Sequence, residues 1–146
     1  MDMTPKQYQA YVKAKAQPSP LGRNLLRAFV TGGLICTLGQ GIISAYTQWG
    51  LEAQIASSMA SVTLMTLSAL LTGSGLYSHV GRFGGAGSLV PITGFANAVV
   101  SAGLDFKSEG WVTGLGSKLF AVAGPVLVYG TTASAVYGII LMLANT

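Results

Sequence analysis

The chain has 146 residues, of which 51% are hydrophobic and only 8% charged, and its formal net charge is +4. Soluble domains carry roughly 25% charged residues, which a surface in contact with water needs in order to stay dispersed. This composition excludes a disordered protein, a nucleic-acid-binding domain and a small soluble enzyme. It indicates a membrane protein.

The positive charge is concentrated at the N-terminus. Residues 1–27 carry the whole net charge of +4, and the charged residues that follow them cancel one another. A basic segment beside a bilayer is a topology signal and an anchor to anionic lipid. We therefore expect residues 1–24 to form a basic tail, and residues 25–146 a single transmembrane domain.

A short helix is predicted inside this tail. Thr4 and Pro5 favour a helix start, because proline is tolerated in the first turn. Three apolar side chains would then share one face: Tyr8, Tyr11 and Val12. This pattern is typical of a helix that lies at the membrane surface, and the Pro-Ser-Pro linker at residues 18–20 would end it. A frayed basic tail is the alternative.

Four runs of the sequence lack Asp, Glu, Lys and Arg, and each is longer than the about 20 residues that a spanning helix needs. They are residues 28–51, 53–81, 83–104 and 119–146. The fold class is therefore an all-α polytopic membrane protein with about four transmembrane spans. The distribution of basic residues places both termini on the inner side.

Several single residues have an expected place in these spans. Three aromatic residues lie where interfacial side chains occur: Trp49, Tyr77 and Trp111. Cys36 has no second cysteine to pair with, and we expect it to be a small packing residue. Close helix packing is also the expected role of three glycines: Gly39, Gly73 and Gly75.

The third run differs from the other three, which predict ordinary helices. It opens with Gly84, Gly85 and Gly87, and Pro91 lies near its middle. Glycine and proline at this density weaken a continuous helix, while hydroxyl and amide side chains can satisfy the freed backbone groups. We expect the third span to be broken or re-entrant. A complete but kinked helix is the alternative.

The four runs contain no ionisable side chain suited to a proton relay or an ion-coupled pump. His79 is the single histidine, and we expect it to be interfacial. We expect no enzyme, no catalytic residue, no cofactor and no metal site. The polarity that remains is uncharged, and it can either join helices or line a path for a polar solute: Gln40, Thr72, Ser74, Ser88, Thr93, Asn97, Ser101 and Tyr129.

Three stretches of the sequence resemble the stage V sporulation protein AC (SpoVAC) family of endospore-forming bacteria. They are FVTGGLICTLGQG at 29–41, LSALLTGSGLYSHVGRFGGAGSLVPITGFANAVVSAGLDFKSEG at 67–110, and residues 120–130. The pattern GAGSxVPxTGFAN followed by KSEG is long and specific. The related SpoVAEb family is similar in its GQ and VPIT elements, but the basic N-terminal extension favours SpoVAC.

The resemblance implies a multi-pass subunit of the SpoVA complex in the inner membrane of the forespore and spore. That complex moves dipicolinic acid, largely as its calcium chelate, into the spore core during sporulation and out during germination. The family is also associated with mechanosensitive, channel-like behaviour. The implied partners are other SpoVA proteins, among them SpoVAD and SpoVAEb, and the lipid bilayer. No nucleic acid is expected.

These inferences lead to a candidate site. The path or constriction is predicted to be lined by residues of the third run together with one residue of the first: Ser88, Pro91, Thr93, Gly94, Asn97 and Gln40. Lys107 and Glu109 would lie at a mouth, or form a local ion pair that fixes the loop. Because four spans make a poor pore alone, we expect an oligomer or a composite pathway. The alternative is a non-conducting assembly subunit of the same complex.

Overall fold

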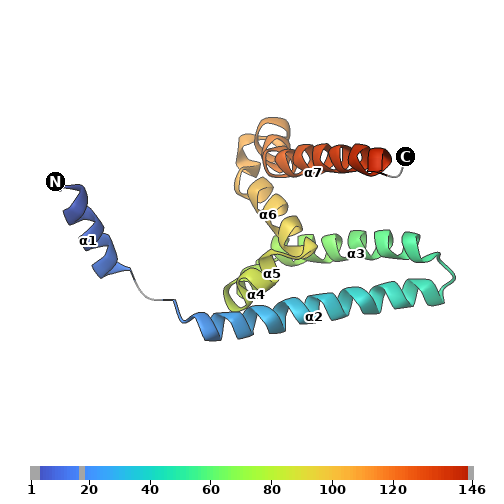
Figure 1. The fold of residues 1–146 in the computed structure, drawn as a ribbon, viewed down its shortest axis with the longest axis horizontal. Coiled ribbons are helices and arrows are strands. Elements are labelled where there is room, and N and C mark those ends of the chain that lie inside the picture. The colour runs from blue at the N-terminus through green and yellow to red at the C-terminus, as the bar shows by residue number, and fades with distance from the viewer. Residues whose placement is uncertain (1–3, 17–18, 145–146) are drawn as a thin grey trace.

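A computed structural model of the chain describes residues 4–16 and 19–144, and every element in these two segments is helical. Figure 1 shows two long helices, α2 and α3, side by side, and a third, α7, set apart from them by the shorter helix α6. Of the predicted linker, Pro18 lies outside the described residues. So does Asp2, the one acidic residue of the basic tail.

The short helix predicted near the N-terminus is α1, Pro5–Lys15. Thr4 caps it: its hydroxyl accepts from the backbone N–H of Gln7, and the Gln7 side chain accepts from the N–H of Thr4. This reciprocal pair satisfies two amide groups that the first turn leaves without a helical partner. Pro5 takes the first helical position, where a missing N–H is harmless.

Helices α2 (Leu21–Gln48) and α3 (Ala53–Gly73) form an antiparallel hairpin. The turn between them contains Gly50 with a φ of +90°, a conformation that favours glycine. Small residues let the two backbones approach closely. A Cβ on Gly39 would lie 3.3 Å from Cδ1 of Leu64, which confirms the packing role expected for Gly39.

The second predicted span ends earlier than its charge-free run. α3 stops at Gly73, the chain turns through Gly75 with a φ of +78°, and a separate helix, α4, covers Tyr77–Gly84. A Cβ at Gly73 or at Gly75 would meet nothing within 4 Å. The packing role expected for these two glycines is therefore wrong, and Gly75 is instead required by the turn.

The third predicted span is interrupted. After Gly85, which has a φ of +51°, the four-residue helix α5 covers Ala86–Leu89, and helix α6 covers Ile92–Asp105. Between them Pro91 is extended, with φ −62° and ψ 165°. Val90, the residue before Pro91, still has helical angles (φ −74°, ψ −41°). The break therefore falls at Pro91 itself, which has no N–H to continue the hydrogen-bond ladder.

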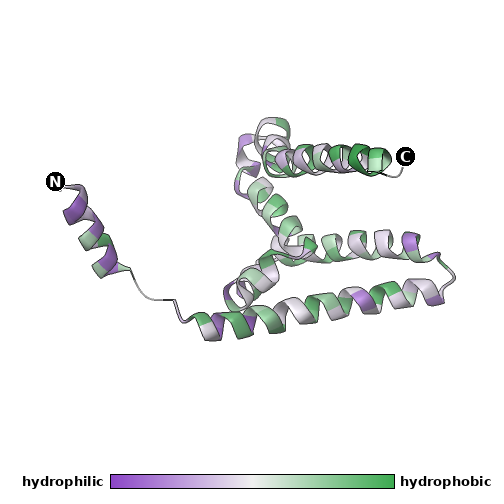
Figure 2. Cartoon of the chain, viewed as in Figure 1, coloured by the Kyte–Doolittle hydropathy of each residue, from purple (hydrophilic) through white to green (hydrophobic). Residues whose placement is uncertain are grey.

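The C-terminal part of the chain is nearly continuous helix. A 3₁₀ turn at Lys107–Glu109 leads into a π-helical segment at Trp111–Gly116, and α7 follows at Ser117–Ala144. None of the residues of α7 is buried. Figure 2 shows hydrophobic residues over most of α7, whereas hydrophilic ones gather on α1 and at the connection between α6 and α7.

Three helices in the described part of the chain are long and apolar enough to cross a membrane: Leu21–Gln48, Ala53–Gly73 and Trp111–Ala144. They correspond to the first, second and fourth predicted spans. The count of four is not confirmed, because the third run is divided between the end of α4, the four-residue α5 and α6, and α6 has 14 residues. A helix of 14 residues is about 21 Å long, which is shorter than the hydrocarbon core of about 30 Å.

Contacts along α6 fix the direction of its neighbours. Ser68 bonds to Thr93 and Thr72 to Asn97, so α3 and α6 run in the same general direction. A Cβ on Gly103 would lie 3.0 Å from Cδ2 of Leu119, whereas Ala123 lies beside the earlier part of α6, so α7 runs the opposite way. Consequently α7 has the direction of α2, as Figure 1 also shows.

Candidate functional site

The interior of the fold is a cluster of uncharged polar side chains between α3, α4, α5 and α6. We call it the polar cluster, and its members are Ser68, Thr72, Tyr77, Ser88, Thr93 and Asn97. Four of the six side chains are buried, and the other two, Thr72 and Asn97, are partly buried. In the described part of the chain, no buried side-chain nitrogen or oxygen lacks a hydrogen-bond partner.

Tyr77 is the centre of this cluster. Only 3% of its surface is exposed, and its hydroxyl donates to the carbonyl oxygen of Ser88 at 2.7 Å. The same hydroxyl lies 3.1 Å from Oγ1 of Thr93. Tyr77 therefore joins the end of α5 to the start of α6 across the interruption, and it supplies a donor to a carbonyl that the short α5 leaves free.

Helix α3 holds α6 through two further hydrogen bonds one turn apart. The Ser68 hydroxyl donates to the carbonyl oxygen of Thr93 at 2.6 Å, and the Thr72 hydroxyl lies 2.9 Å from Oδ1 of Asn97. Residues i and i+4 lie on the same face of a helix, which places both α3 hydroxyls toward α6. Thr93 is thus bonded through its carbonyl and its side chain.

Glycines allow the short helices to pack directly against backbone. A Cβ on Gly87 would lie 2.6 Å from the carbonyl carbon of Ala28, and one on Gly84 would lie 2.6 Å from Cγ2 of Thr31. A Cβ on Gly94 would overlap the backbone of Leu89 across the turn at Pro91. No side chain fits at these positions, so α5 lies directly on the backbone of α2 at Gly87, and α4 lies against the Thr31 side chain of α2 at Gly84.

The structure brings together five of the six residues predicted for the path. Ser88, Thr93 and Gly94 are buried at the junction of α5 and α6, Pro91 forms the break, and Asn97 lies one turn into α6. Their polar groups bond to the protein itself: the Ser88 hydroxyl, for example, donates to the carbonyl oxygen of Gly85 at 2.9 Å. In this conformation they hold helices together.

The sixth residue, Gln40, lies elsewhere. Its side chain is exposed on α2, and the part of α2 that contacts α5 is Ala28–Gly32, two turns earlier. At 1.5 Å per residue, Gly32 and Gln40 are about 12 Å apart along the helix. The structure therefore does not bring Gln40 together with the other five residues at the junction of α5 and α6.

Three further expectations about single residues are changed by the structure. Lys107 and Glu109 are both exposed, and neither forms an ion pair with any residue of 4–16 or 19–144, so a local ion pair does not fix this loop. Cys36 is exposed on α2 and is not packed within the chain. Tyr77 is buried and not interfacial.

Sequence reasoning missed Ser68 and misplaced Tyr77. The signal for Ser68 was its spacing from Thr72, since two hydroxyls one turn apart in an apolar run place a polar stripe on one helix face. Nothing in the sequence identified the partner of that stripe. Tyr77 was misplaced because it lies at the end of a charge-free stretch, which is also where interfacial aromatics occur.

The chemistry available in the polar cluster is hydrogen bonding alone. Its members are hydroxyls and one amide, which are uncharged donors and acceptors. Within the described residues, no group of three or more His, Cys, Asp or Glu side chains could hold a metal ion. The arrangement can position helices and offer neutral donors and acceptors to a solute.

Three apolar spans, an interrupted region between the second and third, and an uncharged polar interior define a polytopic membrane protein. The chain belongs to the SpoVAC/SpoVAEB family of sporulation membrane proteins, whose sequence pattern matches residues 24–140. It is 43% identical over 134 residues to Stage V sporulation protein AC of Bacillus subtilis (strain 168), an alignment that covers 91% of this chain and 89% of that protein. No solved structure matches the chain.

Proposed function

We propose that the chain is a membrane subunit of the SpoVA machinery that moves dipicolinic acid, with calcium, across the inner membrane of the forespore and spore. The observation that supports this most is the interruption at Pro91, surrounded by the uncharged polar cluster. Irregular backbone is tolerated at membrane depth only where protein or a water-filled cavity covers it. Family membership supplies the sporulation context.

The proposed pathway is passive or gated and needs no enzyme chemistry. The polar cluster contains no carboxylate, lysine or histidine, which are the groups that couple transport to protons or ions. Its side-chain hydrogen bonds are satisfied internally, and we propose on this basis that the present conformation is the closed state of the pathway. Opening requires α5 and α6 to move about Gly85 and Pro91, and membrane tension is one stimulus that could drive such a movement.

The region of α5 and α6 is proposed to be re-entrant, so that the chain crosses the membrane three times. α3 and α6 run in the same direction and α7 returns alongside α6. Both ends of the α5–α6 segment then face the side on which α2 begins. This topology places Lys107 on the side of Ser19, whereas four full crossings would place it on the side of Glu52.

Labelling of introduced cysteines decides between these topologies. In a Cys36→Ser background, Ser19→Cys, Glu52→Cys and Lys107→Cys are reacted in intact vesicles with a reagent that cannot cross the membrane. Re-entry predicts that Lys107→Cys and Ser19→Cys react from the same side, with Glu52→Cys as the opposite-side control. If Lys107→Cys reacts together with Glu52→Cys, the segment crosses fully and the re-entrant proposal is refuted.

A path through one chain with three spans is too small for a dicarboxylate, so the pathway is proposed to include several copies or other SpoVA proteins, SpoVAD and SpoVAEb among them. No residue of α7 is buried within the chain, and beyond its contact with α6 near Leu119 and Ala123 its surface is left for lipid or for neighbouring subunits. Lys107, exposed beside the α6–α7 connection, is proposed to attract the anion at a mouth.

A non-conducting assembly subunit is the second candidate. The observation in its favour is that Ser88, Thr93 and Asn97 are all occupied by hydrogen bonds to the protein itself. Side chains used in this way can serve helix packing alone. Partner proteins would then form the path.

Dipicolinate flux through liposomes tests the proposal, first with the purified protein and then with co-purified SpoVA subunits. Asn97→Ala and Pro91→Ala should reduce flux, and in cells dipicolinate accumulation, while the protein stays in the membrane. Thr37→Ala is the matched control, because its exposed hydroxyl bonds only to Gly33 of its own helix. Normal flux in both variants would favour the assembly role, and no flux with or without partners would refute the channel role.

A further inference from the structure

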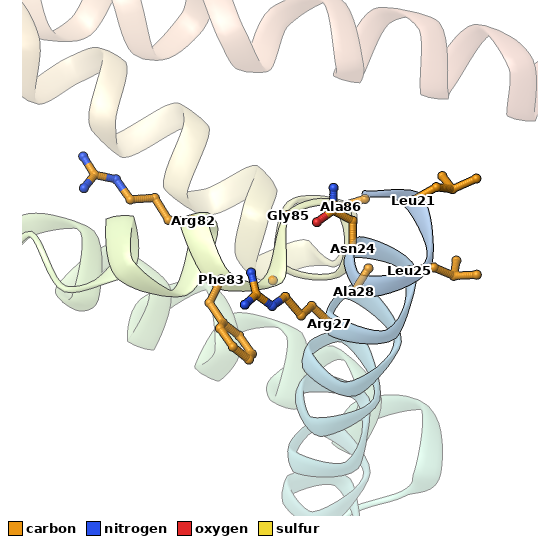
Figure 3. Close-up of a pocket in the computed structure, with 10 residues that line it drawn as sticks. Leu21, Asn24, Leu25, Arg27, Ala28, Arg82, Phe83, Gly85 and Ala86 are labelled. Atoms are coloured by element: carbon orange, nitrogen blue, oxygen red, sulfur yellow. The ribbon is translucent and has the colours of Figure 1, made fainter. Parts of the chain in front are cut away.

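A second polar feature lies outside the polar cluster, at the beginning of α2. A pocket of about 390 Å³ is formed where the first turns of α2 meet the end of α4 and the start of α5. Figure 3 shows its lining, which includes Asn24 and Arg27 from α2 and Arg82 and Phe83 from α4. The function proposed above makes no use of these residues.

The pocket carries positive charge that no residue in the described part of the chain neutralises. Two of its lining residues are arginines and none is acidic. Neither Arg27 nor Arg82 forms an ion pair with any residue of 4–16 or 19–144. Arginine stays protonated in proteins, so both guanidinium groups remain charged and without an acidic partner among the described residues.

Arg27 is held in place at the pocket. Its side chain is half-buried, and the centre of its guanidinium lies 5.2 Å from the centroid of the Phe83 ring. At this distance the guanidinium makes a cation–π contact with the ring, which uses none of its N–H groups as a hydrogen-bond donor. The N–H groups of Arg27 therefore stay available for an oxyanion, and two parallel N–H groups match a carboxylate or phosphate in geometry.

Asn24 and Arg82 complete the surroundings. Asn24 lies one turn before Arg27 on the pocket side, beside Gly85 and Ala86 in Figure 3, and its amide donates to Oγ of Ser19 at 2.8 Å. The second N–H of that amide can donate elsewhere. Arg82 is exposed, and Figure 3 shows its side chain directed away from Arg27. Its long stem lets the charge swing toward the pocket mouth.

We propose that this pocket binds an oxyanion, a carboxylate or a phosphate, with Arg27 as the principal contact and with Asn24 and Arg82 as further donors. The oxyanion can come from a dicarboxylate solute or from the headgroup of an anionic phospholipid. The solute form rests on the transport function proposed above, whereas the lipid form is independent of it. In either case the anion lies next to Gly84 and Gly85, which lead directly into α5.

The test compares Arg27→Ala, Arg27→Lys and Arg82→Ala with the control Arg23→Ala. Arg23 is an exposed arginine on the same helix, one turn earlier, and it does not line the pocket. Each full-length protein is placed in nanodiscs of phosphatidylcholine, and dipicolinate binding is measured by equilibrium dialysis. In parallel, retained phosphatidylglycerol is quantified after purification from a mixed phosphatidylcholine and phosphatidylglycerol preparation.

If the oxyanion is the solute, Arg27→Ala should weaken dipicolinate binding by about 10- to 100-fold, the loss expected for charge-assisted hydrogen bonds. Arg27→Lys should recover part of the lost affinity, because lysine keeps the charge but cannot make the bidentate contact. Arg82→Ala should weaken it less, and Arg23→Ala should stay within about twofold. If the oxyanion is lipid, phosphatidylglycerol retention should follow the same order while dipicolinate does not bind.

Equal effects of Arg23→Ala and Arg27→Ala in both arms would refute the site, because a diffuse basic surface would then explain all binding. Arg82→Ala removes an exposed side chain, so its readout does not depend on the folding of the Arg27 variants. Failure of the transport proposal has a different signature: wild-type liposomes then show no dipicolinate flux, whatever the arginine variants bind.

Discussion

The direct contact between α5 and α2 yields a quantitative prediction at Gly87. A Cβ at this position would lie 2.6 Å from the carbonyl carbon and 2.7 Å from the Cα of Ala28. Carbon atoms in contact normally lie about 3.5–4.0 Å apart. In Gly87→Ala, α5 must therefore move away from α2 by roughly 1 Å, since the atoms opposite belong to backbone and cannot rotate aside.

Overpacking a close contact lowers the free energy of unfolding by about 1–3 kcal/mol. We expect a value near the upper limit of this range for Gly87→Ala, because the overlapping atoms belong to the backbone of Ala28. For a chain of this size, about 3 kcal/mol corresponds to a fall in melting temperature of roughly 6–12 °C. The matched control is Gly33→Ala on the facing helix, where a Cβ meets nothing within 4 Å. Alanine in a helix interior is favoured over glycine by about 0.5–1 kcal/mol, so this variant should melt no lower than the wild type.

The assay is thermal unfolding of the purified proteins in one detergent, followed by far-ultraviolet circular dichroism. A low melting temperature for Gly87→Ala alone supports the packing of α5 on α2. If Gly87→Ala and Gly33→Ala have the same melting temperature, the backbone contact between Gly87 and Ala28 does not exist, and the position of α5 must be different.

Two further variants test other contacts in the same assay. Tyr77→Phe leaves the Ser88 carbonyl without its donor and should lower the free energy of unfolding by about 1–3 kcal/mol. Tyr129→Phe is the control, because Tyr129 is exposed and its loss of a hydroxyl should not change stability. Equal melting temperatures of the two variants would argue against the polar cluster. Gly114→Ala should lower the melting temperature, because its Cβ would overlap the carbonyl oxygen of Phe106. Gly124→Ala is the control, since a Cβ there meets nothing within 4 Å. An unchanged melting temperature for Gly114→Ala would show that the π-helical segment packs differently.

Charge and helix-start signals predicted much of the fold. Three of the four charge-free runs correspond to α2, α3 and the apolar helix that ends at Ala144, because a long run without ionisable side chains has few stable forms other than a spanning helix. The pair Thr4 and Pro5 marked the start of α1 for a local reason, the capping of free N–H groups. Pro91 marked the interruption for a local reason as well, since proline removes a donor.

What the sequence did not predict depends on contacts between distant residues. Nothing in the charge-free run 53–81 marks the end of α3 at Gly73, because in a membrane segment glycine can serve either close helix packing or a turn. Gly39 packs against α3 while Gly75 forms a turn, and the same residue type gave both the same expectation. The burial of Tyr77 depends on α5 and α6 folding back over it, which no periodicity in α4 could reveal.

The position of α5 connects the two polar features of the molecule. Within α5, Gly87 lies against Ala28 of α2, and the carbonyl of the next residue, Ser88, accepts from the Tyr77 hydroxyl; Gly84, at the end of α4, lies against Thr31 of α2. Arg27 immediately precedes Ala28, so an oxyanion bound there lies one residue from the surface on which α5 rests. The contact of Gly87 with Ala28 and the hydrogen bond from Tyr77 to Ser88 both involve the backbone of α5, so α5 cannot adjust by rotating a side chain. An anion that shifts α2 relative to α5 therefore also shifts the Ser88 carbonyl that accepts from Tyr77. Occupancy of the pocket and opening of the α5–α6 segment should therefore be coupled.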